Sequence, residues 1–125
     1  MGDLLRTGSD WLEAMRHKHA SRTVTYRRGA ASVELAATVG RTEYDVDTGH
    51  GIVERYESRD YLLRTADLVL GGAAGTPQAG DRIEEVIAGD TVVYAVMAPA
   101  NEPVWAYSDP GRITMRVHTK QVDTK

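Results

Sequence analysis

The sequence contains no cysteine, so it offers no disulfide bond, thiol nucleophile or zinc–thiolate site. It also contains no phenylalanine, so the aromatic part of a core has to come from two tryptophans and six tyrosines. No apolar run approaches the roughly 18 residues that a membrane span needs, and the N-terminus lacks the apolar stretch of a signal peptide. These absences predict a soluble globular protein with no membrane partner.

Charge and length further restrict the class of protein. The chain carries 15 basic and 18 acidic residues, a formal net charge of −3. A protein this close to neutrality has no general electrostatic attraction to DNA or to anionic lipid. Its 125 residues fit a single domain spanning residues 1–125, large enough to bury about two-thirds of the surface of the unfolded chain.

Residues 3–19 have the pattern of an amphipathic helix, with apolar side chains recurring every three or four positions. Ser9 could instead cap a shorter helix that begins at Asp10. In either case Trp11 is expected to anchor the helix against a sheet or against a neighbouring subunit.

From Arg22 to about residue 119 the apolar period changes to two, which is typical of β-strands. Short strands are predicted near residues 22–27, 33–39, 44–46, 52–58, 82–87, 92–96 and 113–117, and the fourth of these could continue to Leu63. Gly49–Gly51 is predicted to be a loop tip or a bulge. The predicted fold is mainly β, a small β-sandwich or barrel of about seven short strands with one N-terminal α-helix. The polar residues 120–125 are predicted to form a loose tail.

The segment from Gly75 to Met97 is the clearest local pattern. Pro77, Gly80 and Asp81 mark a turn, and two alternating strands follow with a reversal at Gly89-Asp90. The residues before it, 66–75, could form a single helical turn or a bent strand, and the glycines that follow are expected to make a flexible loop.

No set of residues predicts catalysis, a cofactor or a metal. Asp47-Thr48-Gly49 spells the tripeptide of aspartic proteases, but Asp45 and His50 stand where those enzymes need apolar or small residues. Asp45, Asp47 and His50 also lack the spacing of a calcium loop. A polar turn between strands is the simpler interpretation, and a small dimeric hydrolase using Asp47 is the alternative from a different class. A barrel that binds a small ligand is a further option.

Several segments together resemble the small head–tail joining proteins of tailed phages and prophages, also called head-completion or stopper proteins. The resemblance covers the helix at 3–19, VTYRRG at 24–29, ESRDYLLRTADLVL at 57–70, the pattern P-x-x-G-D-x-I at 77–83, Tyr94-x-Val96, and RITMRVHTK at 112–120.

That resemblance implies a non-enzymatic structural protein of the virion neck, made in the cytoplasm of the bacterial host. Such a protein forms a homo-oligomeric ring, commonly a hexamer, beneath the portal and adaptor proteins. The ring closes the DNA-filled head and docks the tail-terminator or tail-tube protein. The alternative within the same neck is a tail-terminator or tail-completion protein. No catalytic residue and no cofactor carry over from the family.

The loops at 40–51 and 66–80 are the predicted contacts with neighbouring neck proteins, and aromatic residues are the predicted anchors. Basic residues near the last strand are either a solvated face or a point of passing contact with packaged DNA. The candidate interface residues are Trp11, Trp105, Tyr107, His50, Asp67, Gly71, Gly72, Arg112 and Arg116.

Overall fold

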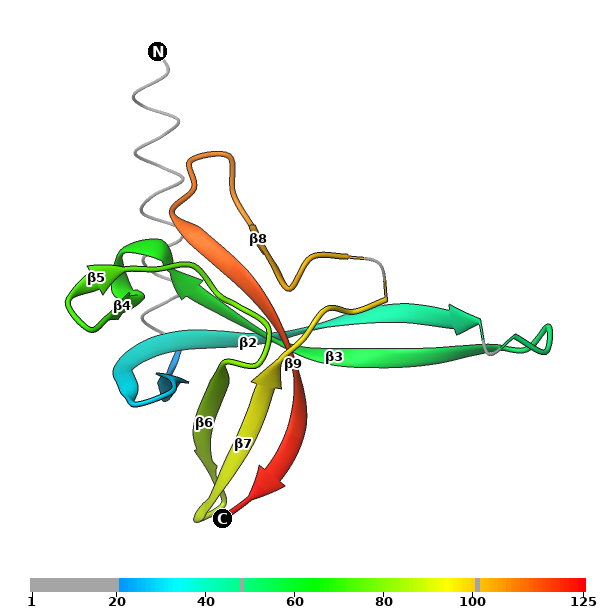
Figure 1. Cartoon of the computed structure of the whole chain (residues 1–125), viewed down its shortest axis with the longest axis horizontal. Coiled ribbons are helices and arrows are strands. Elements are labelled where there is room, and N and C mark those ends of the chain that lie inside the picture. The colour runs from blue at the N-terminus through cyan, green and yellow to red at the C-terminus, as the bar shows by residue number, and fades with distance from the viewer. Residues whose placement is uncertain (1–20, 48, 101) are drawn as a thin grey trace.

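The computed structural model describes residues 21–47, 49–100 and 102–125. The predicted helix at 3–19 and the anchor Trp11 lie outside these residues and stay predictions. The described residues form nine strands and one 3-10 helix: β1 (Arg22–Arg28), β2 (Ala31–Asp47), β3 (Val53–Arg64), η1 (Thr65–Asp67), β4 (Val69–Leu70), β5 (Ala73–Ala74), β6 (Arg82–Ile87), β7 (Asp90–Val96), β8 (Trp105–Tyr107) and β9 (Thr114–Thr124). The prediction of a mainly β protein is confirmed (Figure 1).

Six of these strands close into an antiparallel barrel. Their order is β1-β2-β3-β9-β7-β6, and β6 pairs back onto β1. β8 adds to β9 beside the end of β7, so β9 contacts three other strands. Every pairing is antiparallel, and closure removes the exposed sheet edges that an open sheet of this size would leave.

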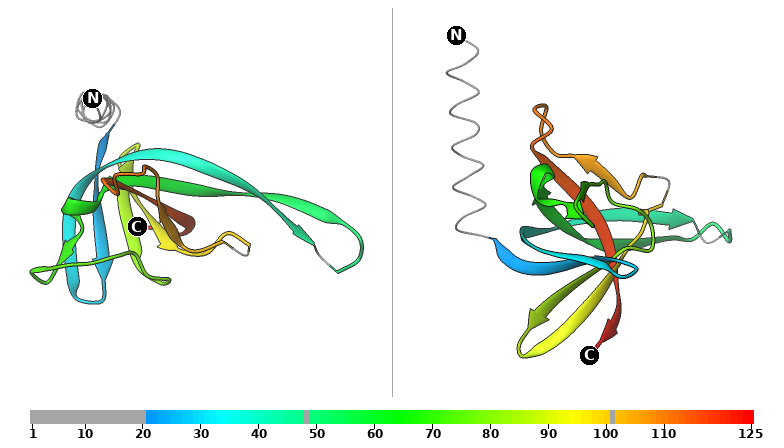
Figure 2. Two further views of the ribbon diagram at one scale, coloured as in Figure 1. Left: turned by 90° about the horizontal axis from the view of Figure 1, so that it is seen from above. Right: turned by 60° about the vertical axis from the view of Figure 1, so that its left-hand side comes forward.

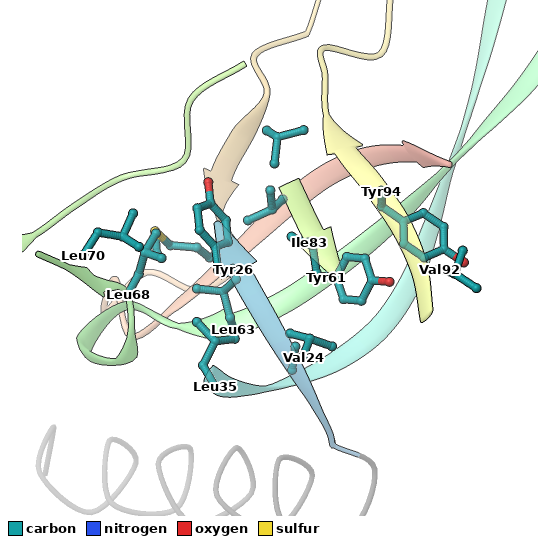
Figure 3. Close-up of a cluster of buried hydrophobic side chains, with 14 residues drawn as sticks. Val24, Tyr26, Leu35, Tyr61, Leu63, Leu68, Leu70, Ile83, Val92 and Tyr94 are labelled. Carbon is teal, nitrogen blue, oxygen red and sulfur yellow. The ribbon is translucent and has the colours of Figure 1, made fainter. Parts of the chain in front are cut away.

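The barrel interior is filled by the side chains that alternate inward along each strand. Tyrosines take the place of the missing phenylalanines, because Tyr26 and Tyr61 are fully buried and Tyr61 meets Tyr94 edge to face, with 5.7 Å between ring centroids (Figure 3). Leu68, just after η1, is also fully buried and closes one end of this cluster. The inward positions predicted for the central hairpin, including Ile83 and Val96, lie in this core.

β2 is much longer than the short strands predicted from the sequence, and β3 corresponds to the predicted strand from residue 52 with its continuation to Leu63. β2 has 17 residues and β3 has 12, and their outer parts form a hairpin that projects away from the barrel (Figures 1 and 2). Residues 43–47 and 53–57 pair only with each other, Arg41 and Thr42 pair with Arg59 and Ser58 at the base, and we call Arg41–Glu57 the arm. The expectation of a loop at 40–51 is therefore wrong for residues 40–47, because the backbone pairing of β2 with β3 continues through Gly40 and Arg41, although the apolar positions change phase there.

Gly40 marks the place where the arm leaves the barrel. A Cβ atom at this position would lie 3.3 Å from a methyl carbon of Leu62 and 3.5 Å from the guanidinium of Arg116. A side chain here would push those two residues aside, so the absence of one lets the strand pass beneath them.

Residues 66–75 contain both of the alternatives left open by the sequence. η1 supplies a short helical turn, and β4 and β5 then form a two-stranded hairpin. Gly71 and Gly72 make its turn with φ values of +62° and +81°, a conformation that glycine adopts without steric cost.

The expectation of a loose tail at 120–125 is wrong. β9 continues to Thr124, and its residues from Thr119 onward pair with β7. These residues are polar because their side chains face solvent, although their backbone completes the barrel. The backbone N–H of Lys125 also donates to the carbonyl oxygen of Thr91 at 2.8 Å.

Deleting residues 120–125 should therefore destabilise the barrel. The deletion removes four of the five register pairs between β7 and β9. At about one hydrogen bond for each lost pair and about 1 kcal/mol for each bond, the free energy of unfolding should fall by about 4 kcal/mol. The midpoint of thermal unfolding, followed by circular dichroism, should fall by about 10 °C. Deleting Lys125 alone is the control, and equal midpoints for the two deletions would restore the loose-tail interpretation.

Candidate docking surfaces

The joint between β1 and β6 brings together two segments that the sequence singled out, VTYRRG and P-x-x-G-D-x-I. Only three residue pairs join these strands in the sheet, against eleven between β2 and β3. Side chains reinforce the joint: the Tyr26 hydroxyl donates to Asp81 at 2.5 Å, and the Arg28 guanidinium binds the same carboxylate at 2.7 Å. The Gln78 backbone N–H also donates to Asp81, at 3.0 Å. The aspartate of the motif therefore has a structural role.

The electrostatics of this joint follow from burial and charge. Asp81 is only 5% exposed, and burial by itself would raise its pKa. Hydrogen bonds from Arg28 and Tyr26 outweigh burial and lower the pKa of Asp81 below its usual value. Burial and the neighbouring carboxylate raise the pKa of Tyr26. Asp81 thus stays ionised and Tyr26 stays neutral across the physiological pH range.

Asp60, on β3, is the centre of a second polar cluster. Its carboxylate accepts from Thr42 at 2.5 Å, from Ser58 at 2.7 Å and from Arg116 at 2.6 Å, and His118 Nδ1 lies 2.8 Å away. Burial would raise the pKa of Asp60, but these four partners outweigh burial and hold the pKa at about 2. The cluster fastens the base of the arm to β9.

Ser58, His118 and Asp60 lie together but do not form a catalytic triad. A triad needs the serine on one ring nitrogen of the histidine and the carboxylate on the other. Here Ser58 Oγ and Asp60 Oδ1 both approach His118 Nδ1, at 3.5 and 2.8 Å, and all three side chains are buried. The geometry supports a structural hydrogen-bond network and no nucleophile.

A third cluster stabilises the end of the core that lies opposite the Asp81 cluster. Glu85 is 3% exposed and accepts from Arg22, Arg59 and the Tyr61 hydroxyl at 2.7 to 2.8 Å. The Arg59 guanidinium also lies 4.9 Å from the ring centroid of Tyr94. All three carboxylates that are buried in the described residues thus hold the barrel together.

The arm has two different faces, because opposite residues of an antiparallel pair point the same way. One face carries Tyr44 and Tyr56, which pair across the strands and stack with ring centroids 6.0 Å apart. Val46 follows on this face, and Ile52 stands at its outer end with 60% of its surface exposed. The other face is charged, with Arg55 next to Asp45 and Glu43 at 3.3 and 3.8 Å. The arm is therefore an exposed amphipathic hairpin.

Two predicted site residues lie at the tip of the arm. Asp47 accepts a hydrogen bond from the Gly49 backbone N–H at 2.9 Å, which stabilises the turn, and His50 is exposed beside it. An aspartic protease needs buried, apolar surroundings around its carboxylates. The position of Asp47 gives the dimeric hydrolase alternative no support.

A second surface forms at the end of the barrel where β8 meets the turn before β9. Trp105 packs partly against the core and meets Tyr107 edge to face at 4.9 Å, and the Arg112 guanidinium lies 5.6 Å from the Tyr107 ring. Thr65 of η1 donates to the Arg112 carbonyl oxygen at 2.9 Å, so the end of η1 with Asp67 lies near this turn. Gly71 and Gly72 are exposed in the adjoining β4–β5 hairpin.

The basic residues predicted near the last strand are only partly neutralised. Arg116 is paired with Asp60, whereas Arg112 keeps its charge beside the ring of Tyr107. The predicted contact of this strand with DNA gains no support from the geometry and stays a prediction.

The aromatic face of the arm is not apparent from the sequence pattern. Tyr44 and Tyr56 fall in separate predicted strands, and the apolar positions change from odd numbers up to Val39 to even numbers at Tyr44 and Val46, so no single alternation marks β2 as one strand. Among residues 21–47, 49–100 and 102–125 there is no group of three or more side chains able to hold a metal ion. Within the same ranges no helix is long and apolar enough to cross a membrane.

A closed barrel with structural polar clusters, a projecting amphipathic arm and exposed end loops does not by itself assign a function. Comparison with protein families supplies the class of protein. The model of the phage head-tail joining protein family matches residues 2–125, and the chain belongs to this family. No curated protein and no solved structure was found to match the chain. The family assigns it a structural role in the neck of a phage, and the resemblance noted in the sequence is confirmed.

Replacing the aspartate of the turn motif should cost stability. Asp81→Asn keeps the shape of the side chain but removes the charge that Arg28 binds, so the free energy of unfolding in urea should fall by about 2 kcal/mol. Asp45→Asn is the matched control, because its ion pair with Arg55 is exposed and should contribute less than about 0.5 kcal/mol. Equal effects of the two substitutions would contradict the role of Asp81.

The depressed pKa of Asp60 predicts an acid-sensitive fold. The folded protein keeps this carboxylate ionised down to about pH 2, whereas the unfolded chain protonates it near 3.8. The stabilisation is therefore present above about pH 4 and is lost as the pH falls from about 4 to about 2. Urea unfolding at a series of pH values should show this loss, and Asp60→Asn should flatten the slope. A slope that Asp60→Asn leaves unchanged would assign the acid sensitivity to other groups.

Proposed function

We propose that this protein is a head–tail connector of the stopper, or head-completion, type. Copies form a ring beneath the portal and adaptor proteins, close the DNA-filled head and present a surface to the tail. The observation that carries the proposal is the family match across residues 2–125.

The geometry supports an assembly role. The barrel is rigid where its three buried carboxylates are satisfied, and no side-chain nitrogen or oxygen buried in the described residues lacks a hydrogen-bond partner. The arm and the end loops project from this frame with exposed aromatic and aliphatic groups. A rigid frame with projecting elements suits a subunit that must contact neighbours on several sides.

Heads and tails made without this protein provide the direct test. Adding the purified protein to a mixture of tailless heads and free tails should yield joined particles visible by electron microscopy and infectious in a plaque assay. Heads preincubated with the protein, then washed, should retain it and accept tails. A protein that binds tail tubes but not filled heads would instead be a tail terminator, and one that binds neither would contradict the proposal.

The arm is expected to be needed for joining and not for folding. Residues 44–56 can be replaced by Asn-Gly, a two-residue turn that suits the facing residues Glu43 and Glu57. The shortened protein should unfold at nearly the temperature of the full chain, because the removed residues pair only with each other. It should fail to restore joining in the assay above. Full joining by a protein without its arm would assign the contacts to the end loops.

A further inference from the structure

The arm contains all of the net charge of the chain. Its 17 residues, 41–57, include two arginines and five carboxylates, a formal charge of −3. The whole chain also has a formal charge of −3, so the remaining residues sum to zero. The five carboxylates are Glu43, Asp45, Asp47, Glu54 and Glu57.

Three of these carboxylates form a ladder on the charged face of β2. Glu43, Asp45 and Asp47 alternate along the strand and therefore point the same way, over a length of about 14 Å. Glu57 faces Glu43 directly on the partner strand. Like charges in that position destabilise the hairpin unless cations approach them. Arg55 and Arg41 offset part of this repulsion, at 3.3 to 3.8 Å.

A complementary feature lies on the outside of the barrel. Arg27, Arg82, Ala95 and Lys120 are adjacent positions on β1, β6, β7 and β9, and we call them the cationic row. Four neighbouring strands span about 14 Å, the same length as the acidic ladder. Arg27, Arg82 and Lys120 are exposed, and the small side chain of Ala95 leaves room in the middle.

Of the three cations in the cationic row, only Arg27 has a carboxylate partner within the described part of the chain. Arg27 is paired with Glu84 at 2.6 Å, whereas within the described part of the chain Arg82 and Lys120 have no carboxylate partner. Arg27 on β1 and Arg82 on β6 are also directly opposite each other in the sheet. Two positive charges in this position repel each other unless an anion lies nearby.

The arm of one molecule cannot reach its own row. The barrel order places β6 and β7, in the middle of the row, across the barrel from β3 and β2, which carry the arm. The arm projects outward from that wall (Figures 1 and 2). The acidic ladder therefore has to meet the row of a second copy. DNA is disfavoured as the occupant of the arm, because its phosphates are repelled by a charge of −3.

We propose that the charged face of the arm docks across the cationic row of the neighbouring copy and joins successive subunits through a heterologous contact. Strands of the arm then cross the strands of the neighbouring barrel nearly at right angles. Each subunit uses two different surfaces, which is the type of contact that closes a ring. The proposal rests on the proposed ring-forming function and names the contact that builds the ring.

Charge reversal on either surface should break the contact. The arm variant is Glu43→Lys with Asp45→Lys, and the row variant is Arg82→Glu with Lys120→Glu. In a ring built from one variant alone, the arm of each copy therefore meets a row of the same charge. The subunit concentration needed for assembly, measured by sedimentation of the free protein or by retention on tailless heads, should rise tenfold or more for each.

Mixing the two variants is the decisive step. The basic arm of the first fits the acidic row of the second, and the acidic arm of the second fits the basic row of the first. The equimolar mixture should therefore assemble at nearly the wild-type concentration, in rings of alternating subunits. Since the chain has no cysteine, Asp45→Cys combined with Ala95→Cys gives a second readout. Oxidised rings should show crosslinks between copies and no crosslinks within one copy.

Matched controls change similar charges elsewhere. Glu54→Lys lies on the opposite face of the arm, and Arg64→Glu removes an exposed cation away from the row. Both should assemble like the wild type. The proposal is overturned if a reversed variant assembles normally, if the mixture is not restored, if the cysteines crosslink to a different virion protein, or if the wild type forms no oligomer alone or on heads.

Failure of this contact is distinguishable from failure of the proposed function. If the wild type joins heads to tails and the row variant joins them equally well, only the arm contact is wrong. If the wild type does not join heads to tails, the connector function itself is wrong.

Discussion

The joint between β1 and β6 is the contact on which the barrel depends. Each of its two hairpins, β1–β2 and β6–β7, is held by local pairing, but only three residue pairs join one hairpin to the other. The Asp81 carboxylate adds strength there, because it binds Tyr26 and Arg28 from β1 and at the same time fixes the turn before β6. Glu85 adds a further link through Arg22. Loss of these side chains would weaken the closure of the barrel and leave the pairing within each hairpin intact.

Local patterns in the sequence predicted local structure well. Alternation and turn residues located the β6–β7 hairpin, the first hairpin and the start of β9. Two errors had the same physical cause, since the polar outer residues of the arm and of residues 120–124 resemble loops although their backbones are paired. Composition reports which side chains face solvent, and it does not report whether the main chain has a partner.

The sites were less predictable, because their members are far apart in the chain. Asp60 and His118 are separated by 58 positions, and Tyr26 and Asp81 by 55, so no spacing rule connects them. Tyr107 and His50 lie at the surface, and their role as interface residues stays a prediction. Arg116 was expected to be available for contact with DNA, but its partner Asp60 neutralises it. The family resemblance supplied the functional class, and only the three-dimensional arrangement showed that the acidic residues of the arm and the basic residues of the row lie on opposite walls.

The contacts of β9 also determine when the subunit becomes competent to assemble. Residues 114–124 follow every strand they pair with, and β3, β7 and β8 all need them. During synthesis those three strands therefore wait, partly unpaired, until residue 124 has left the ribosome. Closure then requires long-range contacts, which form slowly compared with hairpins. The three strands consequently expose unpaired backbone until β9 has folded onto them, and an unpaired strand edge of this kind is prone to aggregation.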